Sequence, residues 1–140
     1  PGVADPGALA VEYAHQQNIQ VVPLVGPSSI LLALMASGLN GQKFAFHGYL
    51  PIEAKEAAQA LKELEKESRH KSQTQIFIET PYRNNSVFDY FLKNLHSETR
   101  LTVALDLTGQ HEFVRTRRIA DWNKEKPVWA KGPAVFLFLA

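Results

Sequence analysis

The chain has 140 residues, and the 45% of them that are hydrophobic are enough to bury the core of one ordinary domain. The net charge is +1 and charges of both signs are interspersed, which gives no argument for a strong nucleic-acid field but leaves room for a local basic patch. There is no cysteine, so disulfides, thiolate chemistry and thiol metal sites are excluded.

The first half of the chain predicts helices that alternate with short strands. A helix over about 6–17 follows the capping residue Asp5, and residues 19–22 predict a short buried strand. Ser28 is the expected cap of a helix through residues 30–37, which is apolar on all sides and should therefore be buried between layers. A strand over 43–49, an amphipathic helix over 54–66 and a polar connection over 69–73 follow.

Strands dominate the second half of the chain. They are predicted over 74–78, 101–105, 113–117 and 134–139, with a loop over 79–85, an amphipathic helix over 88–95 and a single helical turn over 119–122. This order predicts an α/β fold, with a layered mixed β-sheet flanked by helices.

The apolar runs bear on where the protein is located, and the two ends of the chain bear on whether it is part of a longer protein. The apolar runs are too short to cross a bilayer and no signal peptide is visible, so we expect a cytoplasmic protein with no membrane partner. The chain begins at Pro1 in a loop-like sequence and ends directly after an apolar run over 135–139. We interpret both ends as cut edges of a longer protein.

Three turns that follow predicted strands could carry chemistry. The turn over 26–29 opens a helix whose free amides could hold a polar ligand, but on the residues alone plain helix capping is the favoured interpretation. The segment over 79–83 lies where α/β sheets bind ligands, and the favoured alternative is a polar loop in which Arg83 pairs with an acid. The turn over 106–109 is explained by its Asp and Gly.

Other polar residues give weaker signals. The histidines lack the spacing of metal ligands, so no metal site is expected. The group Arg115, Arg117 and Arg118 is interpreted as a solvated face that could also touch phosphate.

Five segments together resemble one known family. In order, residues 2–7, 22–29, 48–51, 76–83 and 105–108 resemble motifs of the tetrapyrrole-methylase family, and they are closest to the branch that methylates a ribose 2′-hydroxyl of small-subunit ribosomal RNA. Ile52 and Glu53 stand where that branch has basic residues, and Tyr82 stands where it has His. These departures bear on the RNA substrate and leave the fold unaffected.

The resemblance implies an enzyme that holds S-adenosylmethionine (SAM) in a cleft between two domains. Residues 1–24 would be the end of the N-terminal domain and a linker, and residues 25–140 the C-terminal SAM-binding domain. Carried over by position, the SAM contacts are Ser28, Ser29, Ile78, Glu79, Leu107, Thr108, Pro133 and Ala134. The resemblance assigns no catalytic residue.

The expected function is therefore SAM-dependent methyl transfer, with ribosomal RNA as a candidate partner and a homodimer as the expected assembly. This chemistry needs no metal or covalent nucleophile from the protein, which mainly aligns the reactants and excludes water. Two alternatives stay open. One is methylation of a tetrapyrrole or another small molecule, and the other is a non-catalytic interaction domain of the same fold.

Overall fold

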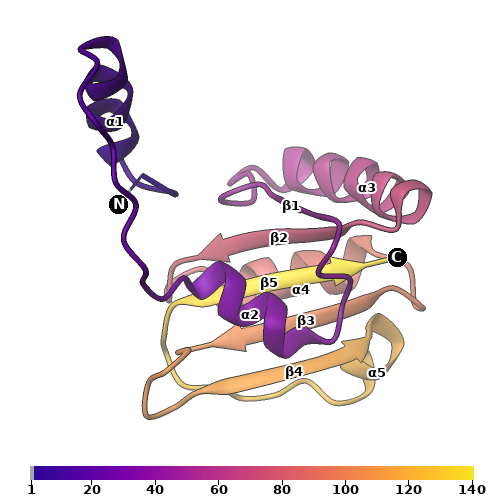
Figure 1. The fold of residues 1–140 in the computed structure, drawn as a ribbon. Helices are drawn as coiled ribbons and strands as arrows, with labels where there is room; N and C mark the ends of the chain where they lie inside the picture. Colours follow the sequence, from indigo (N-terminus) through magenta and orange to yellow (C-terminus); the bar gives the residue numbers. More distant parts are fainter. Residues whose placement is uncertain (1) are drawn as a thin grey trace.

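The computed structural model describes residues 2–140 and has one mixed β-sheet flanked by helices (Figure 1). The elements are α1 (Gly7–Gln16), α2 (Ser29–Ser37), β1 (Phe44–Phe46), α3 (Ala54–Lys71), β2 (Thr74–Glu79), α4 (Asn84–Asn94), β3 (Arg100–Leu105), β4 (Phe113–Arg118), α5 (Ile119–Lys124) and β5 (Ala134–Leu139). The predicted α/β layered fold is confirmed.

The last strand of the chain lies in the middle of the sheet. The strand order is β1-β2-β5-β3-β4; β1 is parallel to β2, and the other neighbours are antiparallel. Every residue of β5 is buried, because the strand has neighbours on both edges and helices over both faces. Its unbroken apolar sequence is typical of such a strand.

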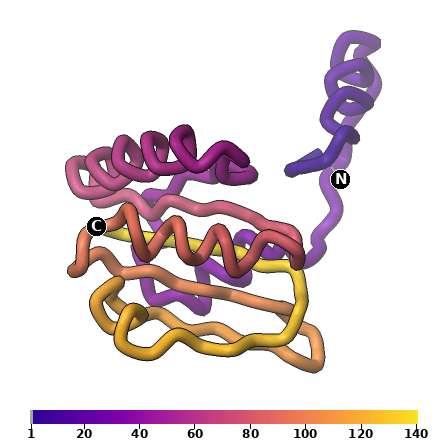
Figure 2. The backbone as a smooth tube through the Cα atoms, turned by 180° about the vertical axis from the view of Figure 1, so that it is seen from behind, coloured from indigo at the N-terminus to yellow at the C-terminus, as the bar shows by residue number. Residues whose placement is uncertain are grey.

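The two faces of the sheet carry unequal layers. Helices α3, α4 and α5 cover one face (Figure 2). The larger core cluster lies on this face and gathers around aromatic side chains that include Phe91, Trp122 and Phe136. The Trp122 indole donates a hydrogen bond of 2.9 Å to the Leu101 carbonyl, so its polar atom is paired inside this core. Helix α2 lies on the other face and packs Ala33 and Leu34 against β5 and its neighbours.

Three helices differ from the prediction. Helix α4 begins at Asn84, inside the predicted loop over 79–85. The apolar helix α2 was expected to be buried on all sides, but Met35 is 80% exposed. Within residues 2–140 only the sheet covers α2, so the opposite face of the helix is open. Helix α3 continues to Lys71 through the predicted polar connection. Basic residues in its last turn suit the negative end of the helix dipole, and the buried Ser68 side chain accepts a hydrogen bond from the Ala140 amide.

The N-terminal segment stands away from the sheet. Helix α1 has no buried residue, and an extended linker joins it to α2 (Figures 1 and 2). The strand predicted over 19–22 is wrong: these residues pair with no strand among residues 2–140. A β-branched sequence favours an extended backbone, but a strand also requires a neighbour to accept and donate its hydrogen bonds. Helices long and apolar enough to cross a membrane are not found among the described residues.

Candidate functional site

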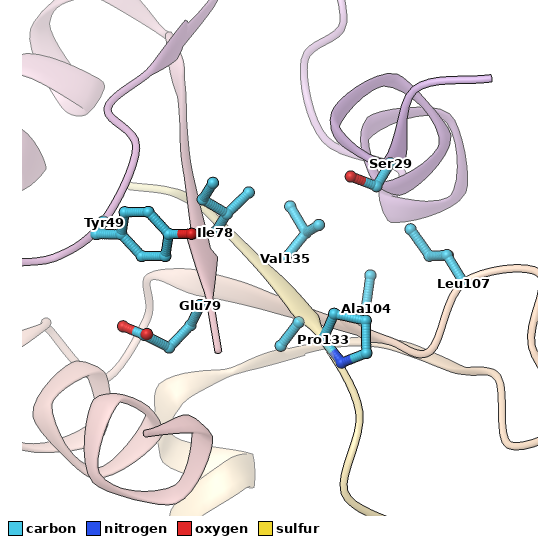
Figure 3. A pocket seen from close by; sticks show the side chains of 9 residues that line it. Ser29, Tyr49, Ile78, Glu79, Ala104, Leu107, Pro133 and Val135 are labelled. Carbon is cyan, nitrogen blue, oxygen red and sulfur yellow. The ribbon is translucent and has the colours of Figure 1, made fainter. Parts of the chain in front are cut away.

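A pocket of about 240 Å³ lies at one edge of the sheet, where β2 and β3 end and β5 begins (Figure 3). We call it the strand-end pocket. Its lining residues are Ser29, Tyr49, Ile78, Glu79, Ala104, Leu107, Pro133, Ala134 and Val135. They come from the first turn of α2, the loop between β1 and α3, the ends of the three strands, the loop between β3 and β4, and the residue before β5. Residues far apart in the sequence therefore meet at a place where α/β sheets commonly bind ligands.

The floor of the pocket is apolar because of the strand register. Val135 lies opposite Ile78 on one side and opposite Ala104 on the other. Since side chains alternate between the faces of a strand, these three point to the same face, the one that α2 covers. Ser29 and Tyr49 lie on opposite sides of this floor (Figure 3). The arrangement can take an apolar ring and offer hydroxyl groups to its polar edges.

Glu79 is the charged group of the pocket, and its side chain is only 1% exposed. Its Oε1 atom accepts hydrogen bonds from the Thr80 amide at 2.8 Å and the Thr80 hydroxyl at 3.3 Å. Its Oε2 atom lies 3.3 Å from Arg83 Nη1, close enough for an ion pair, yet it accepts no hydrogen bond within residues 2–140. Because side chains alternate along a strand, Glu79 points to the face opposite Ile78, and its carboxylate turns away from the pocket floor (Figure 3). The pairing of Arg83 with an acid, favoured from the sequence, is confirmed.

The loop between β3 and β4 holds the other side of the pocket. The Asp106 amide donates to the Pro133 carbonyl at 3.0 Å, and the Asp106 carboxylate accepts from the His111 amide at 3.0 Å. Asp106 adopts a φ of 48°, and a Cβ atom on Gly109 would collide with the Asp106 carboxylate. A side chain at this position would therefore have to displace the Asp106 carboxylate from the His111 amide, and the turn sets Leu107 and Pro133 in the pocket wall.

Six of the eight residues predicted to contact SAM line the strand-end pocket: Ser29, Ile78, Glu79, Leu107, Pro133 and Ala134. Ser28 is the N-cap of α2 but its side chain makes no capping hydrogen bond, and it is not a lining residue. Thr108 lines a neighbouring hollow beside α2.

Tyr49, Ala104 and Val135 line the strand-end pocket but were not predicted as site residues. Tyr49 lies in a segment that carried the resemblance, which was a signal that could have found it. Ala104 and Val135 enter through the strand register, which the sequence does not encode locally.

The arginine group on β4 is largely engaged by acids. Arg117 pairs with Glu125 at 3.1 Å, and Arg118 pairs with Asp121 and Glu98. The hydrogen bond to Asp121, followed by the one to Glu98, raises the pKa of the Arg118 guanidinium. Arg115 is exposed and lies over the Phe113 ring, with no acidic partner among residues 2–140, so it is the member of the group that stays open to phosphate. Within residues 2–140 no cluster of three or more His, Asp or Glu side chains could hold a metal ion.

Similar curated proteins include ribosomal RNA small subunit methyltransferases I from several bacteria. Ribosomal RNA small subunit methyltransferase I of Vibrio cholerae is 35% identical over 98% of this chain and 47% of that protein. The Synechocystis protein of the same name is 36% identical over 80% of the chain and 39% of its own length, and the Escherichia coli O157:H7 protein is 31% identical over 98% and 48%. The chain thus spans about half the length of the curated relatives it matches. No family model matches the chain.

Solved structures share the fold at low sequence identity. Uroporphyrin-III-C-methyltransferase from Thermus thermophilus matches with a TM-score of 0.58 and 18% identity, over 99% of this chain and 60% of that one. A conserved hypothetical protein from Aeropyrum pernix matches with a TM-score of 0.63 and 13% identity, over 100% and 55%. The predicted resemblance is confirmed: the chain is homologous over 98% of its length to about half of ribosomal RNA small subunit methyltransferase I, and it has the fold of part of the tetrapyrrole methylases.

Proposed function

We propose that the chain is part of a SAM-dependent methyltransferase that acts on a ribose 2′-hydroxyl of small-subunit ribosomal RNA. The observation that carries this proposal is the strand-end pocket, because six of the residues expected to contact SAM converge there from separate parts of the chain. The homology to a ribosomal RNA methyltransferase supports the choice of acceptor. An enzyme with this acceptor would work in the cytoplasm.

The residues of the pocket fit the cofactor. SAM, when bound, supplies both the methyl carbon and its leaving group. The apolar floor of Ile78, Ala104 and Val135 excludes water from the ring of the ligand, and the Ser29 and Tyr49 hydroxyls fix its orientation. Glu79 borders the pocket, and its carboxylate turns to the face of the sheet opposite the floor, where Arg83 balances its charge.

We further propose the domain division that the resemblance implies. Residues 1–24 form the end of an N-terminal domain and a linker, and residues 25–140 form the C-terminal SAM-binding domain. Two facts support this division: α1 has no buried residue, and the sheet with its helices begins only at Ser29.

A second candidate function is methylation of a tetrapyrrole or another small molecule. The fold match to uroporphyrin-III-C-methyltransferase and the presence of Ile52 and Glu53 in place of basic residues favour it. A non-catalytic interaction domain is a third candidate, and it is favoured only if the pocket does not bind SAM.

The acceptor can be tested directly with the full-length protein and radiolabelled SAM. We expect label to enter small-subunit ribosomal RNA and mass spectrometry of the digested RNA to locate the methyl group on a ribose. Uroporphyrin-III serves as the competing acceptor under the same conditions. Label in the tetrapyrrole alone would favour the second candidate, and no SAM binding at all would contradict the proposed enzyme.

We also predict that the full-length protein is a homodimer. Large apolar side chains at Leu24, Val25 and Met35 are exposed, and such residues often mark surfaces that another chain covers. Sedimentation at micromolar concentration is expected to give twice the mass of one chain, whereas a monomer would contradict the prediction. The 140-residue chain is a poorer sample, because its exposed apolar surface can associate artificially.

A further inference from the structure

Arg83 contacts two separate loops at the strand-end pocket. Its guanidinium donates to the Leu50 carbonyl at 3.4 Å and to the Pro51 carbonyl at 3.3 Å, in the loop that carries Tyr49. The same group lies 3.3 Å from the Glu79 carboxylate at the end of β2. Each contact is long, but the planar guanidinium meets all three oxygens at once. A lysine ammonium has no planar fork and cannot reproduce this set.

Asn84, the next residue, makes the matching contact on the other side. It is 3% exposed, and its Nδ2 atom donates a hydrogen bond of 2.7 Å to the Gly132 carbonyl. Gly132 directly precedes Pro133, which lines the pocket at the entry to β5. The two residues at the start of α4 therefore connect one helix to both walls of the pocket.

We infer that Arg83 and Asn84 form a brace that holds the two walls of the strand-end pocket at the spacing a ligand requires. Both are positioning residues: Arg83 acts through Tyr49 and Glu79, and Asn84 acts through Pro133. The effect on ligand affinity rests on the function proposed above, whereas the brace itself does not. Loss of either contact lets a loop move. A ligand must then order that loop when it binds, which lowers its affinity.

Two backbone amides report the position of the walls without any ligand. The Ile78 amide donates to the Gly48 carbonyl at 2.9 Å, in the loop that Arg83 holds. The Asp106 amide donates to the Pro133 carbonyl at 3.0 Å, in the segment that Asn84 holds. Hydrogen exchange at these amides measures how often each wall opens.

Arg117 supplies a matched control. Its side chain is 28% exposed, against 26% for Arg83, and it also pairs with a glutamate and lies over the Trp122 ring. It stands on β4 and lines no part of the pocket. A general loss of stability should therefore affect Arg83→Lys and Arg117→Lys alike.

The test compares Arg83→Lys, Asn84→Ala and Arg117→Lys by hydrogen exchange and by calorimetry with S-adenosylhomocysteine, on the full-length protein. We expect exchange about tenfold faster at the Ile78 amide in Arg83→Lys and at the Asp106 amide in Asn84→Ala, with no change at either in Arg117→Lys. The dissociation constant should rise about fivefold or more in the first two variants only.

Two results would contradict the brace. One is exchange at the two amides that is no faster in Arg83→Lys and Asn84→Ala than in Arg117→Lys. The other is unchanged ligand affinity in a variant whose amide exchanges faster. Arg83→Lys keeps a positive charge beside the buried carboxylate and should fold. If Asn84→Ala fails to fold, Arg83→Lys therefore still tests the brace. If the unmodified protein fails to bind S-adenosylhomocysteine, the proposed function is wrong. The hydrogen-exchange rates of the two amides then test the brace by themselves.

Discussion

Replacing Ser29 by Phe is expected to lower the affinity of the full-length protein for SAM by on the order of 100-fold. Ser29 lines a pocket of about 240 Å³, so a phenyl ring at this position would fill a large share of the space that a ligand needs (Figure 3). The ring must either displace the ligand or push α2 away from the floor, and both outcomes weaken binding.

The fold should tolerate this substitution. Ser29 is exposed in the first turn of α2, and among residues 2–140 its hydroxyl makes no hydrogen bond that the change would break. Ser and Phe have similar helix propensities, so the melting temperature should change little. Ser29→Ala is the control for loss of the hydroxyl alone, and its affinity should stay within a few-fold of the original. Calorimetry that finds unchanged SAM affinity in Ser29→Phe would place the cofactor elsewhere.

The 140-residue chain by itself is expected to fold but to transfer no methyl group above background. It should fold because two contiguous apolar clusters, one on each face of the sheet, give it a core of its own. It should not catalyse because it spans about half the length of its relatives, and the resemblance assigns the other wall of the cleft to the remainder.

The expected loss of activity follows from the loss of alignment between the reacting atoms. Misplacement of reacting atoms by about 1 Å can lower a rate by on the order of 100-fold. A ligand held by only one wall of the cleft can move by more than this distance, so the rate should fall further. Binding should weaken as well, since ligand clefts normally bury roughly 70–90% of the ligand surface.

Two measurements check this prediction. A thermal melt followed by circular dichroism should give one cooperative transition of an α/β domain. Incubation with radiolabelled SAM and either ribosomal RNA or a tetrapyrrole should give no product above background, with the full-length protein as the positive control. Transfer by the 140 residues at the rate of the full-length protein would mean that the active site lies entirely within them.

Local patterns in the sequence determined most of the secondary structure. The alternating charges and apolar stripe of α3 and the apolar run of β5 identified these elements, because the periodicity of a helix or strand is a property of neighbouring residues. The same holds for the turn at Asp106 and Gly109. The polar pairing of Arg83 was also anticipated, although only its acidic partner and not the Leu50 and Pro51 carbonyls.

The tertiary structure alone decided which of these elements are covered and which residues meet. Residues 19–22 have a strand sequence but no strand beside them among residues 2–140, and the apolar α2 has only one face against the sheet. Pairing and burial depend on distant parts of a chain. The strand-end pocket needed the register that sets Val135 between Ile78 and Ala104. Such a register follows from the packing of the whole sheet, so no local pattern could place Ala104 and Val135 in the pocket.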